Sequence, residues 1–159
     1  GMNTDVYNYL FGSILSMSQQ DVTLTAILSL VVLALFIFFY HRIFAVTFDE
    51  TFARATGMNA GLYNILIALL TALVIVVGMR MMGSLLISSL IVFPAMTAMR
   101  LCRTFLSVIL HAACISVGCL LVGITISYLY ATPTGASIVL CNIAVFLVYS
   151  LIALVRDRN

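Results

Sequence analysis

The sequence is poor in charge. Only 8% of its 159 residues are charged, it has no lysine and no tryptophan, and all seven of its basic residues are arginines. In a soluble domain about 25% of residues are charged and about half are apolar, whereas this sequence is 64% hydrophobic with a mean hydropathy of +1.25. A folded domain of this length still exposes about a third of its unfolded surface. A water-soluble enzyme is therefore excluded, and a net charge of +2 is too small for a nucleic-acid-binding surface.

The four cysteines form no Cys-x-x-Cys pair, and three of them lie inside apolar runs. A disulfide framework or a zinc knuckle needs closer cysteine spacing with polar flanks. We therefore predict that Cys102, Cys114, Cys119 and Cys141 are free thiols that pack as small hydrophobic side chains.

What the sequence does contain is five long apolar runs without charged residues. A helix needs about 20 apolar residues to cross about 30 Å of hydrocarbon. Strands are not expected, because the runs lack the alternation of a membrane barrel and because backbone groups in lipid must be hydrogen-bonded internally. The sequence therefore predicts an all-α, polytopic membrane helix bundle. Its predicted spans are residues 22–40, 62–79, 81–99, 104–130 and 134–155.

The arginines predict the orientation of the chain in the cell membrane. Six of the seven lie in the connections at residues 41–61, 100–103 and 156–159. Because positive residues favour the cytoplasmic side, we expect the N-terminus of this chain outside and its C-terminus in the cytoplasm. The seventh, Arg80, is expected at an exterior hinge between the second and third spans. Five spans with an exterior start suit a fragment that lacks upstream helices.

The cytoplasmic loop at residues 41–61 contains a helix too short to span the membrane. Thr47 and Glu50 have the spacing of a capping box, in which Thr47 would be the N-cap. Glu50 would pair with Arg54 one turn later. Gly57 would end the helix in the left-handed conformation. The loop is therefore predicted to hold a short helix with a defined start and end.

This short helix would carry two aromatic side chains, Phe48 and Phe52, on one face, one turn apart. Small residues such as Ala53 would keep it slim. One interpretation is an amphipathic helix that lies on the membrane surface. The other is a projection that docks on a cytoplasmic partner.

Residues 48–57, with the sequence FDETFARATG, resemble the cytoplasmic coupling segment of metal-ion ABC transporter permeases of the zinc, manganese and iron uptake type. Three further stretches follow in the order of that family: 9–15 resembles an exterior loop, 77–98 its proline-bearing helix, and 133–140 its last exterior turn and final helix. Four ordered motifs are much more specific than any one of them. The resemblance implies that residues 1–159 are a single transmembrane permease domain, the C-terminal portion of a longer permease.

The resemblance also implies a fold and partners. The fold would be like that of a type II ABC importer, with about five transmembrane helices and a short cytoplasmic coupling helix. The chain would be a non-catalytic, homodimeric subunit in the lipid membrane, with a cytoplasmic ABC ATPase below it and an extracytoplasmic metal-binding protein above it. It would bind no cofactor, and a divalent transition-metal ion would be its substrate. The residues implied in coupling to the ATPase are Phe48, Asp49, Glu50, Phe52, Ala53, Arg54 and Gly57.

At the exterior face, the resemblance implies a turn formed by Pro133 and Gly135. Members of the family often have an acidic residue just before this turn, and here Tyr130, Ala131 and Thr132 precede the proline. If that acidic residue helps to receive a cation, this chain has either no residue for the role or one at another position.

Two places within the spans are candidates for a translocation path. Pro94 frees the carbonyl of Leu90 and is expected to bend the third span, with hydroxyls such as that of Thr97 compensating for the lost hydrogen bond. This bend is either a static kink or part of the path. His111 and Cys114 share a helix face and form a candidate metal pair. The alternative for His111 is a hydrogen bond to a serine or a backbone carbonyl.

Other functions are weighed against this one. No Asp or Glu lies inside the five runs, which argues against a proton- or sodium-coupled carrier. An iron-siderophore or corrinoid importer has a similar coupling loop and exterior turn, but residues 92–95 (VFPA) favour the metal-ion branch. A small membrane interaction protein without transport activity remains a third interpretation. A membrane enzyme is the least favoured, because no helix pairs a nucleophile with a base.

Overall fold

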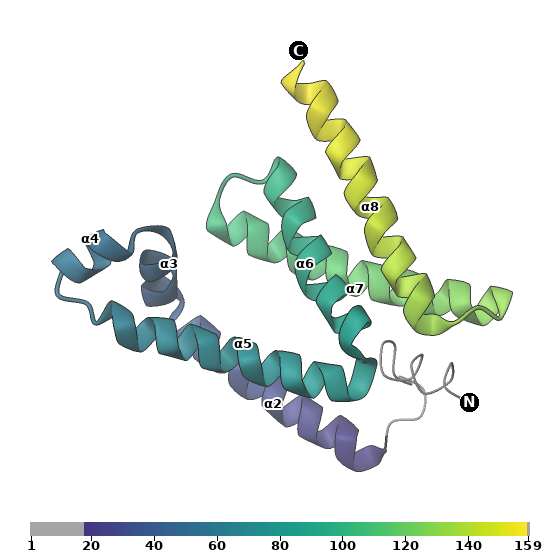
Figure 1. Cartoon of the computed structure of the whole chain (residues 1–159), viewed down its shortest axis with the longest axis horizontal. Helices are drawn as coiled ribbons and strands as arrows, with labels where there is room; N and C mark the ends of the chain where they lie inside the picture. The colour runs from purple at the N-terminus through teal and green to yellow at the C-terminus, as the bar shows by residue number, and fades with distance from the viewer. Residues whose placement is uncertain (1–17, 159) are drawn as a thin grey trace. The chain divides into compact units, whose positions relative to one another are not determined.

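The computed structural model describes residues 18–158, and the regular structure in that part of the chain is entirely helical. These residues form two compact units that divide between Val77 and Gly78. Each unit is described by itself (Figure 1).

The first unit begins with α2 (Gln19–Phe38), α3 (Tyr40–Phe48) and α4 (Glu50–Ala55). Ser18 caps α2 in a capping box, in which its hydroxyl accepts from the Asp21 amide at 3.2 Å and the Asp21 carboxylate accepts from the Ser18 amide. α2 and α3 are separated only by Phe39. The unit then continues into α5 (Ala60–Met82).

The core of the first unit lies where α3, α4 and α5 meet. Its buried members are Val46 of α3, Ala53 of α4, and Ala60 and Tyr63 of α5. Ala53 is fully buried between the neighbouring helices. The partly buried side chains around this core are those of Phe39, Ala45, Met58 and Leu66.

The second unit packs α6 (Ser84–Leu101), α7 (Phe105–Tyr130) and α8 (Thr134–Asp157) against one another (Figure 1). α7 and α8 lie close together at Gly123, where an added Cβ would lie 2.7 Å from the Cα of Ile138. Leu86 of α6 and Ile138 are fully buried in the bundle. Small residues in α7 thus allow α8 to approach at backbone distance.

Within residues 18–158, five helices are long and apolar enough to cross a membrane: α2, α5, α6, α7 and α8. This confirms the number and the approximate positions of the predicted spans. The predicted hinge at Arg80 is wrong, because α5 continues past it to Met82. The break falls at Gly83, whose φ of +86° is readily adopted by a residue without a side chain.

The four cysteines are free, as predicted. Cys119 is buried, Cys102 and Cys141 are partly buried, and Cys114 is exposed.

Candidate functional site

The segment predicted to couple the chain to a partner is α4, and its start differs from the prediction. Thr47 is not the N-cap, because it lies in the last turn of α3. The helical path is interrupted at Asp49, where φ is −148°. The Oδ1 of Asp49 accepts a hydrogen bond from the Phe52 amide at 2.9 Å and so caps α4. The short helix therefore begins two residues later than a Thr47 cap implies.

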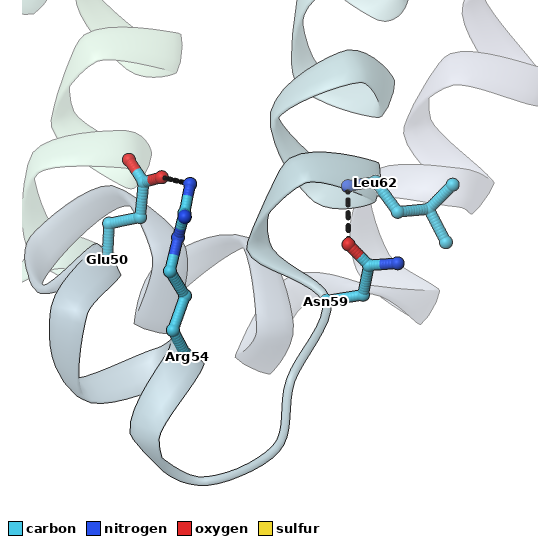
Figure 2. Close-up of polar contacts among 4 residues, drawn as sticks. All are labelled: Glu50, Arg54, Asn59 and Leu62. Atoms are coloured by element: carbon cyan, nitrogen blue, oxygen red, sulfur yellow. Dashed lines mark hydrogen bonds and ion pairs between the residues drawn. The ribbon is translucent and has the colours of Figure 1, made fainter.

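The predicted pair of Glu50 and Arg54 is present on the exposed surface of α4. The Arg54 Nη2 lies 2.5 Å from the Glu50 Oε1, as Figure 2 shows. Hydrogen bonding to the Arg54 guanidinium lowers the pKa of the Glu50 carboxyl below its ordinary value, and a hydrogen bond from the Asn64 side chain adds to this effect. The charged form of Glu50 is thus favoured by its partners.

The predicted stop at Gly57 is confirmed. Its φ is +85°, and its amide donates to the carbonyl of Arg54 at 3.1 Å. The Met58 amide donates to the carbonyl of Ala53 at 3.1 Å, which completes a Schellman motif. Asn59 then caps α5 through a 3.2 Å hydrogen bond from the Leu62 amide to its Oδ1 (Figure 2). Both ends of the turn between α4 and α5 are therefore fixed by hydrogen bonds.

The two phenylalanines belong to different helices. Phe48 ends α3 and Phe52 lies in α4, so the prediction that they share one helix face is wrong, for the same reason as the misplaced cap. Each is 64% exposed, and Phe48 also contacts Phe44 with 4.8 Å between ring centroids. Ala53, by contrast, is fully buried in the core. α4 therefore buries Ala53 and leaves Phe52 and the Glu50–Arg54 pair exposed.

Two residues that the sequence did not single out as site residues hold this segment. Arg42 of α3 donates a hydrogen bond to the hydroxyl of Tyr63 of α5, and its guanidinium lies 5.7 Å from the centroid of the same ring. The two residues are 21 positions apart, and no spacing rule connects such positions in sequence.

Both predicted path residues of α6, Pro94 and Thr97, are buried in the second unit. The expected hydrogen bonds from hydroxyl groups to the carbonyl freed by Pro94 are not found at Thr97 or Ser88. Thr97 donates to the carbonyl of Phe93 at 2.7 Å, and Ser88 donates to that of Ser84 at 2.7 Å. These hydroxyls thus bond within their own helix, four residues back, rather than to the carbonyl freed by the proline.

His111 and Cys114 are both exposed on α7. The Nδ1 of His111 lies 2.9 Å from the carbonyl oxygen of Ser107, which is the backbone hydrogen bond given above as the alternative. Within residues 18–158 no group of three or more His, Cys, Asp or Glu side chains is placed to hold a metal ion.

The predicted exterior turn joins α7 to α8. Pro133 is exposed and Gly135 is buried in the first turn of α8. The chain turns at Ala131, which has a φ of +52°. Four hydroxyl groups bond around this turn, a feature that the sequence analysis missed. The Ser127 hydroxyl donates to the Thr132 carbonyl at 2.5 Å and lies 2.9 Å from the Thr134 hydroxyl. The Ser137 hydroxyl lies 2.9 Å from the Thr132 hydroxyl and donates to the Pro133 carbonyl, also at 2.9 Å.

The structure therefore places the predicted coupling residues together in the first unit, and the predicted path and exterior-turn residues in the second. The stretch at residues 9–15, which resembles an exterior loop, lies outside the described residues.

Residues 1–153 match the ABC 3 transport family. The chain belongs to this family. Among its relatives within the ABC 3 transport family is the high-affinity zinc uptake system membrane protein ZnuB of Haemophilus influenzae, 32% identical over 91% of this chain and 56% of the relative. The manganese import system permease protein ScaB of Streptococcus gordonii is 31% identical over 95% of this chain and 54% of the relative.

A solved structure agrees with this membership in the ABC 3 transport family. PsaBC from Streptococcus pneumoniae in complex with Fab is 31% identical, with a TM-score of 0.85 over 92% of this chain and 53% of that chain. The chain thus spans about half the length of the relatives that it matches.

Proposed function

We propose that this chain is part of the membrane-spanning permease subunit of an ATP-driven importer of divalent transition-metal ions: zinc, manganese or iron. The observation that supports this most is the match of residues 1–153 to the ABC 3 transport family, together with relatives named for zinc uptake and manganese import. These names favour a metal-ion importer over a siderophore or corrinoid importer and over a membrane protein without transport activity.

In this proposal the subunit is non-catalytic, and a separate cytoplasmic ABC ATPase docks on α4. The supporting features are the Asp49 cap, the Gly57 stop and the exposed aromatic ring of Phe52. Because both ends of α4 are fixed, closure of an ATPase would move the helix as a rigid body. Phe48, Asp49, Glu50, Phe52, Ala53, Arg54 and Gly57 would be the coupling residues.

On the exterior side, an extracytoplasmic metal-binding protein would deliver the ion near the turn at Pro133 and Gly135. The N-terminus of this chain would be outside and its C-terminus in the cytoplasm, with two copies of the permease forming a homodimer in the lipid. The hydrogen-bonded hydroxyls around the turn favour a surface of fixed shape, as a docking protein requires.

The ion would pass along a wall that includes Pro94, Thr97 and His111, with His111 and Cys114 as a possible pair of contacts for a soft cation. What supports this is their chemistry alone: a helix-breaking proline, a hydroxyl, an imidazole and a thiol inside apolar spans. The ion is the substrate, and the chain would bind no cofactor.

The proposal is tested with the full-length permease, co-expressed with its candidate ATPase. Phe52→Glu places a charge on the exposed face of α4 and is expected to reduce the amount of co-purified ATPase several-fold. Arg103→Glu is the matched control, because it reverses a charge in another cytoplasmic connection and leaves α4 intact. Retention of the ATPase by Phe52→Glu, at the level of the control, would show that α4 is not the docking site.

The substrate is tested by ATP-dependent uptake of zinc, manganese and iron into vesicles that contain the assembled importer. Accumulation of at least one free ion is expected. Uptake of an iron-siderophore or corrinoid complex in place of all three ions would overturn the proposed substrate class.

A further inference from the structure

α4 is too short to hold its position by itself. It has six residues, and isolated helices shorter than about 12 residues are marginal in water. Its placement depends on its neighbours. One contact is made by the fully buried Ala53, which packs with Val46 of α3 and with Ala60 and Tyr63 of α5.

A second contact joins α3 directly to α5. Arg42 donates a hydrogen bond to the hydroxyl of Tyr63, and its guanidinium carbon lies 5.7 Å from the centroid of that ring. Tyr63 is only 6% exposed, and its ring also packs on Phe39 at 6.0 Å between centroids. A hydrogen bond from a charged donor and a cation–π interaction therefore act on one buried side chain. We name this contact the Arg42–Tyr63 latch.

The Arg42–Tyr63 latch adds a direct link between α3 and α5, so that α3, α4 and α5 are joined pairwise. α3 and α4 are joined by the single residue Asp49, and α4 and α5 by the hydrogen-bonded turn from Thr56 to Asn59. With α3 held to α5 by the latch, each of the three helices is fixed to the other two. None can then shift alone without breaking buried contacts.

We propose that the Arg42–Tyr63 latch makes α3, α4 and the start of α5 move as one body, so that a displacement of α4 is delivered to α5. Arg42 and Tyr63 are positioning residues in this scheme, because they act by holding α4 and α5 in register. The inference rests on the proposed docking of an ATPase at α4. It predicts that loss of the latch uncouples ATP hydrolysis from ion uptake while leaving ATPase binding intact.

A competing explanation assigns Arg42 to the membrane. An arginine at the end of a span can extend along apolar surface to reach the lipid headgroups. The two explanations differ in what they require of Tyr63: the hydrogen bond of the latch needs its hydroxyl, whereas a headgroup anchor needs only the arginine.

The test uses the full-length permease with its ATPase and binding protein in liposomes, and measures ions imported per ATP hydrolysed. Tyr63→Phe keeps the buried ring and removes the hydroxyl, so the variant is expected to fold. Arg42→Gln removes the charge. Each single change is expected to lower the ratio several-fold, with co-purified ATPase unchanged, and Arg42→Lys is expected to restore part of it.

The double variant decides between the explanations. If the two residues act through each other, Tyr63→Phe with Arg42→Gln lowers the ratio no further than the worse single variant. Arg100→Gln is the matched control, because Arg100 also lies near an aromatic ring, that of Phe146 at 5.6 Å, but outside the first unit. Its ratio is expected to equal that of the unchanged permease.

Three outcomes would overturn the latch: single variants with an unchanged ratio, a double variant whose loss is the product of the two single losses, or an equal loss in Arg100→Gln. Failure of the unchanged permease to retain any ATPase would instead overturn the proposed function, and this inference with it.

Discussion

At the scale of single residues, the close approach of α7 and α8 depends on the absence of a side chain at Gly123. An added Cβ would lie 2.5 Å from the Cγ1 of Ile138 and 2.7 Å from its Cα, so the backbone of α8 would have to move. Gly123→Ala is expected to destabilise the protein by about 1–3 kcal/mol, the usual cost of overpacking. Thermal unfolding in detergent measures this.

Gly118 provides the matched control on the same helix. A Cβ there would meet no heavy atom within 4 Å, and alanine is favoured over glycine in a helix by up to about 1 kcal/mol. Gly118→Ala is therefore expected to leave the melting temperature unchanged or raise it. Equal destabilisation by both substitutions would contradict the close α7–α8 approach.

Glu50 makes a pH-dependent contribution whose sign follows from its pKa. Because Arg54 lowers the pKa of the folded state below the ordinary value of 4.5, the charged form is favoured by folding. The stabilisation that charged Glu50 provides is fully present at pH values above its ordinary pKa. It is lost as the pH falls through the lowered pKa of the folded state. The difference in unfolding free energy between the unchanged protein and Glu50→Gln should thus be constant from neutral pH to about pH 6 and shrink only in acid. A change between pH 6 and 8 would contradict the assignment.

At the scale of helices, the start of α4 can be located by substitution. Loss of an N-cap costs about 1 kcal/mol, whereas asparagine is as good a cap as aspartate. Asp49→Ala is expected to speed hydrogen exchange at the Phe52 amide, and Asp49→Asn is expected to leave it near the original rate. Thr47→Ala should have little effect. If Thr47→Ala instead sped exchange at the Glu50 amide, which a Thr47 cap would bond, the capping box predicted from the sequence would be correct after all.

The sequence predicted the helices well because membrane spans are specified by composition over about 20 residues, which tolerates errors of a few positions. The cap of α4 was harder to predict, because Thr47 and Asp49 are both good capping residues and their choice depends on where α3 ends. The hinge was misplaced for a related reason: Arg80 is the more conspicuous residue, but Gly83 alone can adopt the positive φ without strain.

In the candidate site, contacts between residues near in sequence could be predicted, whereas contacts between distant residues could not. Glu50 and Arg54 are one helical turn apart, so their pairing follows from helix geometry. Arg42 and Tyr63 meet only because three helices fold back on one another, and nothing in the spacing of the two residues indicates it. The sequence pointed to Ala53 as a small residue of this helix, but not to its burial against Val46, Ala60 and Tyr63, which depends on the same folding back of the helices.

At the scale of the whole molecule, most of the apolar surface is not covered by the chain itself. α2 has no buried residue, and large apolar side chains are exposed along every span. Such exposed apolar surface is expected of helices that cross a membrane. The chain also spans only about half the length of its relatives.

The orientation of the chain is a property of the whole molecule that the arginine distribution predicts and that labelling can test. In a full-length permease in which the four cysteines are replaced by serine, Thr132→Cys places a thiol at the turn before α8, and Arg158→Cys places one after α8. Both positions are exposed. A membrane-impermeant maleimide is expected to label Cys at 132 in intact cells and Cys at 158 only in inside-out vesicles. α8 is long and apolar enough to cross the membrane once between the two positions, so they are expected to label from opposite sides. The reverse pattern would place the arginine-rich connections, with α4, outside the cell. That result would remove the cytoplasmic docking surface on which the proposed coupling depends.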